Sequence, residues 1–558
     1  MTSIPLGVEG VLGTLYVKKP VSESVPDWVD FFVKDLPVGD ELKRLKNTST
    51  SAILIKEVDG RQFAIAFGHG RHLLDLSCIE YRFGIKVALN VIEPDSISSI
   101  DRQTFDAAPK ITKTQTIKPT SLTDYSVNTE QDLLRGVVGS AKPEFKKNFG
   151  SIVAGIDSLK LSVITSLETI DELLRNSLAR FGSKDYLVSD SERASAFAWV
   201  DNLQAVPDPI VKSNLDRQLW EAFEKNDFDG IFMSIPELIE WEEISGFAYT
   251  EAQSKDSEKI VNSLDVVEFK SSLRSDSSLE TLRNRNIFVV TNESGYVKRF
   301  SAYRCLYAEI RLVDDASLYV LTAGNWFKVE PSFEAQINSH FRSIEILKFS
   351  PPFVEYNHEG EGGYNDAVAL AAGKEYLLLD RKLIQFGGKH SSIEVCDLYK
   401  TKPKDESLGK LVHVKRGRDS SSLSHLFAQG LVSSTLLVSE PDFVKEVNSQ
   451  IAKNGGVMLP SKIIAQNYDV VFAIVDGPAG SVLELPFFSK VNLQNCVRSI
   501  KAFGFGVKFL HIPEAAVYLA KKKAENDAKA AIKKATTIKG KGSLAVKAKP
   551  VPKARSKP

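Results

Sequence analysis

Three short apolar runs followed by an amphipathic helix constrain the fold of this 558-residue chain more than any other stretch. The runs are rich in Leu, Ile and Val, and they cover Tyr376 to Phe386, Ser392 to Tyr399 and Lys410 to Lys415. Runs of this length that are bounded by turn residues are typical of consecutive antiparallel strands. A helix is predicted after them, with Ser421 or Ser422 as its N-cap. Its apolar residues recur with helical spacing at Leu423, Leu426, Phe427 and Leu431.

Polar side chains lie at the ends of the second and third predicted strands. Asp397 closes the second strand, and His413 and Lys415 close the third. We expect His413 and Lys415 on one face, because side chains alternate along a strand. A carboxylate at one strand end, beside a lysine of the neighbouring strand, could hold a divalent metal and the lysine around one phosphodiester. The metal would activate water and neutralise the charge of the transition state, and the lysine would orient the nucleophile or stabilise the developing anion. The pattern therefore favours phosphodiester hydrolysis with Mg²⁺ or Mn²⁺ as the cofactor.

The order of Asp397, a hairpin, the tripeptide 413–415 and a helix resembles the core of restriction-endonuclease-like nucleases of the PD-(D/E)XK class. In that class an Asp precedes an (E/Q)-x-K tripeptide, an acidic residue lies on a preceding helix, and a Gln sometimes lies on the following helix. The resemblance implies an αβββαβ core and these catalytic residues: Asp397, His413, Lys415, Glu361 and Gln429. Asp397, Glu361 and His413 would hold the metal, and Lys415 would stabilise the developing charge.

The sequence departs from this class at His413, which stands where the class has Glu or Gln. An imidazole ligand changes the metal preference and makes the metal affinity depend on pH. In the opposing interpretation Asp397 is a solvated turn residue that pairs with Lys415 or Arg416. The fold of the class is then compatible with a protein that binds nucleic acid without cleaving it.

Further carboxylates complete the set of candidates. The helix-borne acid is assigned to Glu361, at the start of the segment EGGYNDAVALAAG, with Glu355 as the alternative. Asp380 and Glu394 are reserve carboxylates, and a structural or surface role is the opposing interpretation for each of them.

Motifs spread over nearly the whole chain carry a second resemblance. They are FAIAFGHGRHLL, FGIKVALNVI, DLLRGVVG, CLYAEIRL with YVLTAGNWFKV, IEVCDL, LVHVKRG, SSLSHLFAQG and LPFFSKVNL. Together they look like the signatures of one sporadically distributed family of uncharacterised bacterial proteins, which travels with mobile elements and defence genes. By association alone, the resemblance implies a role against foreign nucleic acid from phage or mobile elements.

The charge of the chain is balanced overall but unevenly distributed. Residues 521–558 carry 13 Lys/Arg and 2 Asp/Glu, whereas the preceding residues carry 58 and 69. A basic tail attracts nucleic acid without sequence preference, in a salt-dependent way. The predicted nucleic-acid contacts are Arg416, Arg418, Lys521, Lys522 and Lys523. A tail that aids solubility, or that lies against the acidic body, is the alternative.

Several features bear on location and covalent chemistry. The chain has no run of 18 apolar residues, and its N-terminus lacks the basic and apolar regions of a signal peptide. We therefore expect a cytoplasmic protein without a membrane partner. The four cysteines lie far apart without a CxxC motif, which argues against a zinc ribbon and against a disulfide framework.

The predicted fold class is mixed α/β (α+β) with several domains. The expected divisions are an N-terminal mixed α/β domain at 1–250, a linker and β-meander at 251–334, a restriction-endonuclease-like domain at 335–513 and a basic tail at 514–558. The predicted function is a metal-dependent nuclease that acts on foreign nucleic acid, DNA in preference to RNA. A catalytically inactive binding or regulatory scaffold is the alternative, and a homo-oligomer or a protein partner is left open.

Overall fold

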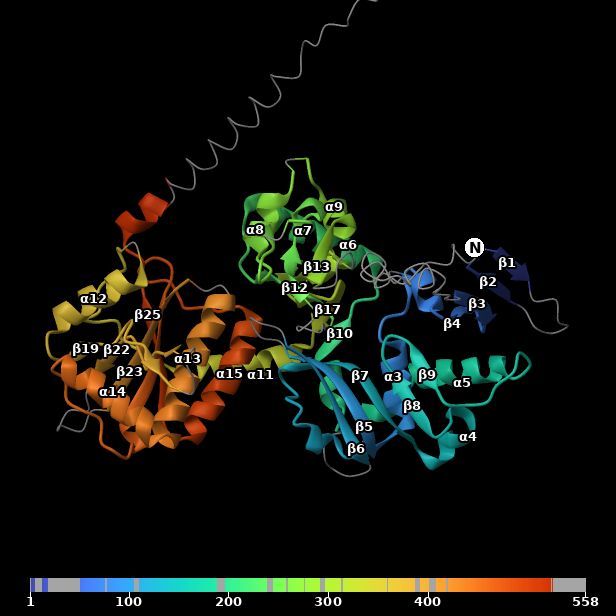
Figure 1. Cartoon of the computed structure of the whole chain (residues 1–558), viewed down its shortest axis with the longest axis horizontal. Coiled ribbons are helices and arrows are strands. Elements are labelled where there is room, and N and C mark those ends of the chain that lie inside the picture. The colour runs from blue at the N-terminus through green and yellow to red at the C-terminus, as the bar shows by residue number, and fades with distance from the viewer. Residues whose placement is uncertain are drawn as a thin grey trace, which may run out of the picture.

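The computed structural model describes residues 2–5, 13–18, 51–75, 78–104, 110–187, 196–237, 244–256, 259–274, 276–291, 297–312, 315–358, 360–386, 392–400, 408–417, 420–522 and 524. These residues form a mixed α/β protein in which several sheets are packed with helices (Figure 1), as the sequence predicts. Within the described ranges, every helix is too short or too polar to span a bilayer.

Two antiparallel sheets lie in the N-terminal part of the chain. The first has the strand order β1 (Thr2–Pro5), β2 (Thr14–Val17), β3 (Ser51–Val58) and β4 (Arg61–Gly68). The second has the order β6 (Lys110–Thr120), β5 (Ile92–Thr104), β7 (Asp132–Ala141), β8 (Ile152–Gly155) and β9 (Leu159–Leu161). The helices in this part of the chain are α3 (Phe83–Val91), α4 (Lys146–Phe149) and α5 (Ile170–Gly182). The turn Asp59–Gly60, with φ of 50° and 72°, joins β3 to β4, as expected of a two-residue hairpin loop.

Two further sheets form the middle of the molecule. One has the order β10 (Leu203–Ala205), β17 (Asn325–Val329), β16 (Leu318–Thr322), β15 (Leu306–Arg311) and β11 (Ile231–Met233). The other has the order β12 (Ile244–Ala248), β13 (Asn286–Thr291) and β14 (Val297–Ser301). The helices are α6 (Pro209–Lys225), α7 (Glu251–Ser254), α8 (Val266–Ser272), α9 (Leu279–Asn284) and α10 (Ala302–Cys305).

The structure divides the single meander that the sequence predicts after residue 286. The short helix α10 separates β14 from β15, and the side chain of Ser301 caps it by accepting a hydrogen bond from the Arg304 N–H at 3.3 Å. Ala302 and Cys305 are buried, so the helix is fixed in the core. The expected boundary at residue 250 also lies between paired strands, because β11 pairs with β15 and β12 with β13.

The C-terminal sheet has six strands and positions the candidate site. Their order is β18 (Glu345–Leu347), β25 (Gly506–Ile512), β24 (Tyr468–Val475), β23 (Gly409–Arg416), β22 (Leu398–Lys400) and β19 (Tyr376–Leu378). The first four strands are parallel to one another, whereas β22 runs antiparallel to both β23 and β19. In chain order this region has α12 (Glu361–Ala372), β19, the short strands β20 (Ile384–Gln385) and β21 (Ser392–Ile393), β22, β23, α13 (Ser420–Ser439), α14 (Pro441–Lys453) and β24. The expected helices and strands are therefore present together with an additional strand pair and an additional helix.

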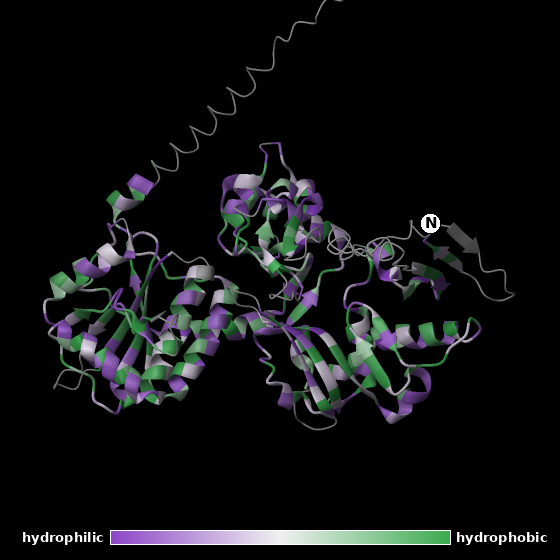
Figure 2. Cartoon of the chain, viewed as in Figure 1, coloured by the Kyte–Doolittle hydropathy of each residue, from purple (hydrophilic) through white to green (hydrophobic). Residues whose placement is uncertain are grey.

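Helices cover both faces of this sheet. Tyr364 and Val368 of α12 pack with Val412 and Val414 of β23 on one face. The other face is covered by α13, α14 (Pro441–Lys453) and α15 (Phe487–Ala502), and α11 (Pro331–Arg342) leads into the sheet. All eight residues of β24 are buried, and hydrophobic residues run along the central strands (Figure 2). A strand buried on both faces is expected at the centre of such a sheet.

The first two predicted strands of this region are shorter than the sequence suggests. The run 376–386 is divided into β19 and β20 (Ile384–Gln385), and the run 392–399 into β21 (Ser392–Ile393) and β22. β20 and β21 form a separate hairpin outside the main sheet. The break falls at Arg381, whose φ of 61° is incompatible with an extended strand.

Candidate metal centre

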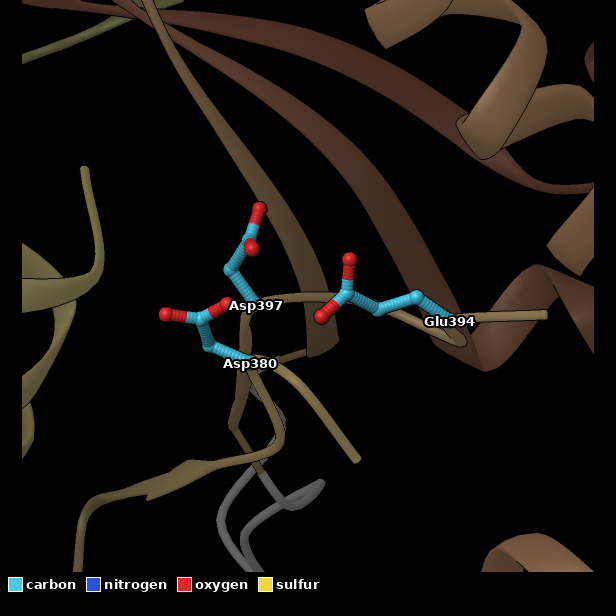
Figure 3. A group of neighbouring side chains, drawn as sticks. All are labelled: Asp380, Glu394 and Asp397. Carbon is cyan, nitrogen blue, oxygen red and sulfur yellow. The ribbon is translucent and has the colours of Figure 1, made fainter. Parts of the chain in front are cut away.

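Three carboxylates meet at the edge of the C-terminal sheet. Asp380 follows β19, Glu394 follows β21, and Asp397 immediately precedes β22. One oxygen atom of each residue lies within 4.8 Å of the others, and the three side chains turn toward one another (Figure 3). Each of the three residues lies next to a different short strand. They come together because the two predicted strands are each divided into two.

Asp397 is held in place by the backbone of β23. Its Oδ2 accepts a hydrogen bond of 2.6 Å from the Val414 N–H, and its own N–H donates to the Val412 carbonyl at 2.9 Å. The carbonyl of Asp397 in turn accepts from the N–H groups of Leu379 and Asp380 at 2.8 and 2.9 Å. These contacts fix a carboxylate that is only 8% exposed.

The other two carboxylates are held from both sides of the sheet. Asp380 Oδ2 accepts from Asn365 Nδ2 of α12 at 3.3 Å, and it lies 3.3 Å from Arg381 Nε. Glu394 accepts a short hydrogen bond from the Arg381 backbone N–H, and its Oε2 lies 3.5 Å from Gln429 Nε2 of α13. The two helices on opposite faces therefore both reach the cluster.

The electrostatics of the cluster favour a positive charge or protons. Burial, opposed by the hydrogen bond from the Val414 N–H and assisted by the neighbouring Glu394, Asp380 and Glu361, raises the pKa of Asp397 to about 8. Burial also raises the pKa of Glu394, assisted by Asp380. Carboxylates that repel one another in a low-dielectric site retain protons unless a cation binds. The donor set is all oxygen, which suits Mg²⁺ or Mn²⁺.

Lys415 and Glu361 contact each other at the end of β23. Glu361 Oε2 is 2.9 Å from Lys415 Nζ, and Glu361 Oε1 accepts from the Arg416 N–H at 3.0 Å. Glu361 is the first residue of α12, so it links this helix to the end of β23. It is close enough to Asp397 to raise the pKa of that residue, although its partners are Lys415 and Arg416.

His413 is not a member of the cluster formed by Asp380, Glu394 and Asp397. Its side chain is 1% exposed, and its ring packs against Phe472 with 6.2 Å between centroids. Burial lowers the pKa of His413 to about 4, so the imidazole is neutral. Its Nε2 has no hydrogen-bond partner among the described residues. The predicted alternative to Glu361, Glu355, is exposed.

The predicted nucleic-acid contacts fall into two groups. The guanidinium of Arg416 lies 5.9 Å from the ring centroids of both Tyr356 and Tyr518, and it donates a short hydrogen bond to Tyr518. Lys521 and Lys522 lie in the helical segment 516–522, where Lys522 is 3.5 Å from Glu514. Arg418 and Lys523 lie outside the described residues.

The fold and the cluster define a multidomain mixed α/β protein whose C-terminal sheet carries three clustered carboxylates and, on β23, a lysine paired with Glu361. The chain belongs to the family of unknown function DUF6119, whose model matches residues 6–513. The sequence-based assignment to a family of uncharacterised proteins is thereby confirmed. No curated protein and no solved structure matches the chain.

Proposed function

We propose that the C-terminal sheet is the catalytic part of a metal-dependent phosphodiesterase that cleaves nucleic acid. The observation that carries the proposal is the convergence of Asp380, Glu394 and Asp397, whose ligand atoms lie within 4.8 Å of one another. The strand β23, which pairs with β22 next to Asp397, carries Lys415. An Mg²⁺ or Mn²⁺ ion bound there supplies a Lewis acid and an activated water. The proposal uses Asp380 and Glu394 as ligands in place of His413 and Glu361.

The residues of the chain have distinct roles in this proposal. Asp397 is the most strongly fixed ligand, because the backbone of β23 holds its Oδ2. Lys415, whose side chain is 25% exposed, is bound by Glu361 and can turn from it to a substrate phosphate. A lysine ammonium beside a phosphodiester stabilises the charge that develops during cleavage. Gln429 orients Glu394 from α13.

Cleavage assays test the proposal directly. Supercoiled plasmid, single-stranded DNA and single-stranded RNA are incubated with the protein and Mg²⁺ or Mn²⁺. We expect the wild type to cleave DNA, and Asp397→Asn and Lys415→Ala to lower the rate at least about 100-fold. Asp442→Asn and Lys445→Ala are the matched controls, because this pair is exposed on α14. A wild type that cleaves none of the substrates with either metal would contradict the proposal.

A scaffold that binds nucleic acid without cleaving it is the second candidate. The observation that favours it is that Lys415 is neutralised by Glu361, while His413 is buried against Phe472. The two candidates differ in their dependence on metal. A scaffold shifts DNA equally in EDTA and in Mg²⁺, and Asp397→Asn leaves that shift unchanged.

The same proposal includes foreign DNA as the biological substrate, which is supported by the family resemblance alone. Its test is the plating efficiency of phage on bacteria that produce wild type, Asp397→Asn or Asp442→Asn. We expect protection of at least about tenfold from the wild type and the Asp442 variant only. Equal plating on all three strains would exclude this substrate for the phages used.

A further inference from the structure

A buried amide lies directly against the carboxylate cluster. Asn365 of α12 is 1% exposed, and its Nδ2 is 3.3 Å from Asp380 Oδ2. Its Oδ1 is buried and has no hydrogen-bond partner among the described residues. Buried acceptors without a partner are rare and costly, so each one calls for a physical reason.

The backbone of α12 is shaped to keep this amide close to the cluster. A Cβ atom on Gly362 would lie 3.3 Å from Asp380 Oδ2 and 3.2 Å from Arg381 Cζ. A side chain at position 362 would therefore crowd Asp380 and Arg381. Tyr364, which is fully buried beside Asn365, anchors the helix to the sheet and donates a hydrogen bond to the Val354 carbonyl at 2.9 Å.

The distance between Asn365 and Asp380 matches that between neighbouring metal ligands. Two oxygen ligands at right angles around Mg²⁺, each at about 2.1 Å, are about 3.0 Å apart, and the side-chain atoms here are 3.3 Å apart. Rotation of the amide by half a turn exchanges Nδ2 and Oδ1. It would place an oxygen atom at that position, and two facing oxygen atoms are favourable only when a metal cation or a proton lies between them.

Arg381 does not prevent a cation from binding at Asp380. Its guanidinium contacts Asp366 through Nη2 at 3.0 and 3.2 Å, whereas Nε is 3.3 Å from Asp380. The Arg381 side chain is 63% exposed. It can therefore remain bound to Asp366 while Asp380 turns to a cation.

We propose that Asn365 is a fourth oxygen ligand of the metal centre, and that its amide rotates to present Oδ1 when a divalent cation binds. This inference rests on the proposed metal centre of Asp380, Glu394 and Asp397. The neutral amide adds a donor without adding negative charge to three carboxylates that already repel one another. It also gives a physical reason for the buried Oδ1 atom, which has no hydrogen-bond partner among the described residues.

Titration with Mn²⁺ tests the inference without relying on cleavage. The full chain is titrated with Mn²⁺, and the concentration of free Mn²⁺ in solution is measured by electron paramagnetic resonance. We expect Asn365→Leu, which has a similar shape and no oxygen, to weaken binding at least about tenfold, and Asn365→Asp to stay within about threefold of the wild type or to bind more tightly. Asp397→Asn should abolish binding in the same assay. Asn365→Leu that binds as tightly as the wild type would overturn the inference.

A measurement on the wild type alone tests the inference without requiring that any variant folds. Protein labelled with ¹³C at the asparagine side-chain carbonyl is loaded with Mn²⁺ and examined by electron–nuclear double resonance. A ¹³C coupling of a directly bound amide supports the inference, and its absence from the loaded protein refutes it. If the wild type binds no Mn²⁺ at all, the metal centre itself is refuted, which is a different outcome.

Discussion

At the scale of single residues, Asp397 has the property that most clearly separates the cation-free from the cation-bound state. Burial raises its pKa to about 8, so the folded protein holds a proton that the unfolded chain releases near pH 4. The stability that this proton provides is complete below pH 4 and is lost as the pH rises toward 8. A divalent cation would replace the proton, and we expect it to bind more tightly at higher pH.

The first prediction concerns Asp397→Asn without divalent cations. The amide can still accept the Val414 hydrogen bond but has no charge, so the variant should gain stability relative to the wild type between pH 4 and pH 8. One pKa unit corresponds to about 1.4 kcal/mol, and we expect a gain of about 2 to 4 kcal/mol at pH 8. Urea unfolding at several pH values measures it, with Asp442→Asn as the control. Parallel pH profiles for wild type and Asp397→Asn would show that Asp397 is ionised when folded.

The second prediction concerns His413, whose Nε2 is buried without a partner among the described residues. Replacing a buried polar group that lacks a partner by an apolar group of similar size is neutral or stabilising. We expect His413→Leu to change the free energy of unfolding by less than about 1 kcal/mol and to leave Mn²⁺ binding within about twofold. A loss of Mn²⁺ affinity of tenfold or more would show that His413 is a ligand, as its place in the tripeptide suggests.

The residue scale also shows what the sequence can reveal about the site. Asp397 and Lys415 are visible because each stands at the end of an apolar run, and Asp380 and Glu394 are visible only as reserve carboxylates. Their convergence depends on the turn at Arg381, whose positive φ leaves no signal in a run of apolar residues. Asn365 lies on a helix face that looks like any other, and only the folded structure brings it within 3.3 Å of Asp380.

At the scale of elements, α13 shows how close packing overrides helix propensity. A Cβ atom on Gly430 would lie 2.6 and 2.8 Å from the ring atoms Cε1 and Cζ of Phe472 on β24. Phe472 is fully buried, with Phe427 against it at 5.2 Å between ring centroids. The glycine therefore lets α13 lie directly on the sheet, and α13 is the helix that carries Gln429 to the cluster.

The third prediction follows from this contact. Glycine to alanine in a helix interior normally stabilises a protein by about 1 kcal/mol. Gly430→Ala should instead destabilise it by about 1 to 3 kcal/mol, because the added methyl group overpacks the core. Thermal and urea unfolding measure the change, and Gly363→Ala on the first turn of α12 is a control with a neighbouring atom no nearer than 4.0 Å. A stabilised Gly430→Ala would mean that α13 can move away from Phe472 at little cost.

The order of elements is more readily predicted than their pairing. Alternating apolar runs and helical stripes are local signals, and they predict helices and strands around the C-terminal sheet, although not the division of two runs into β19, β20, β21 and β22. The separation of the expected meander into two sheets leaves no local signal. It depends on β11 (231–233) and β12 (244–248), which pair with the distant strands β15 and β13. Such partners are set by burial in the whole molecule, which short patterns do not report.

At the scale of the whole molecule, α15 joins the parts of the chain. Its N-terminal N–H groups, at Phe487 and Phe488, donate to Glu309 of β15 at 2.6 and 2.8 Å. On the same helix, Arg498 donates two hydrogen bonds to Glu130, one of them 2.9 Å long, and Gln494 donates to Glu130 at 2.8 Å. The helix that packs on α13 thus also contacts β15 of the middle sheet and the turn that precedes β7.

The last prediction uses the contact between Glu309 and the N-terminus of α15. The Glu309 carboxyl group satisfies two N–H groups. Burial raises its pKa to about 7, so it carries the charge that compensates the positive end of the helix dipole above that pH. Glu309→Ala should lower the free energy of unfolding by about 1 to 2 kcal/mol, whereas Glu446→Ala on the exposed face of α14 should change it by less than about 0.5 kcal/mol. Hydrogen exchange can then show where the loss occurs. If α15 alone loses protection, the cap is local; if α13 and the strands around Asp397 lose it too, the middle sheet supports the candidate metal centre through this helix.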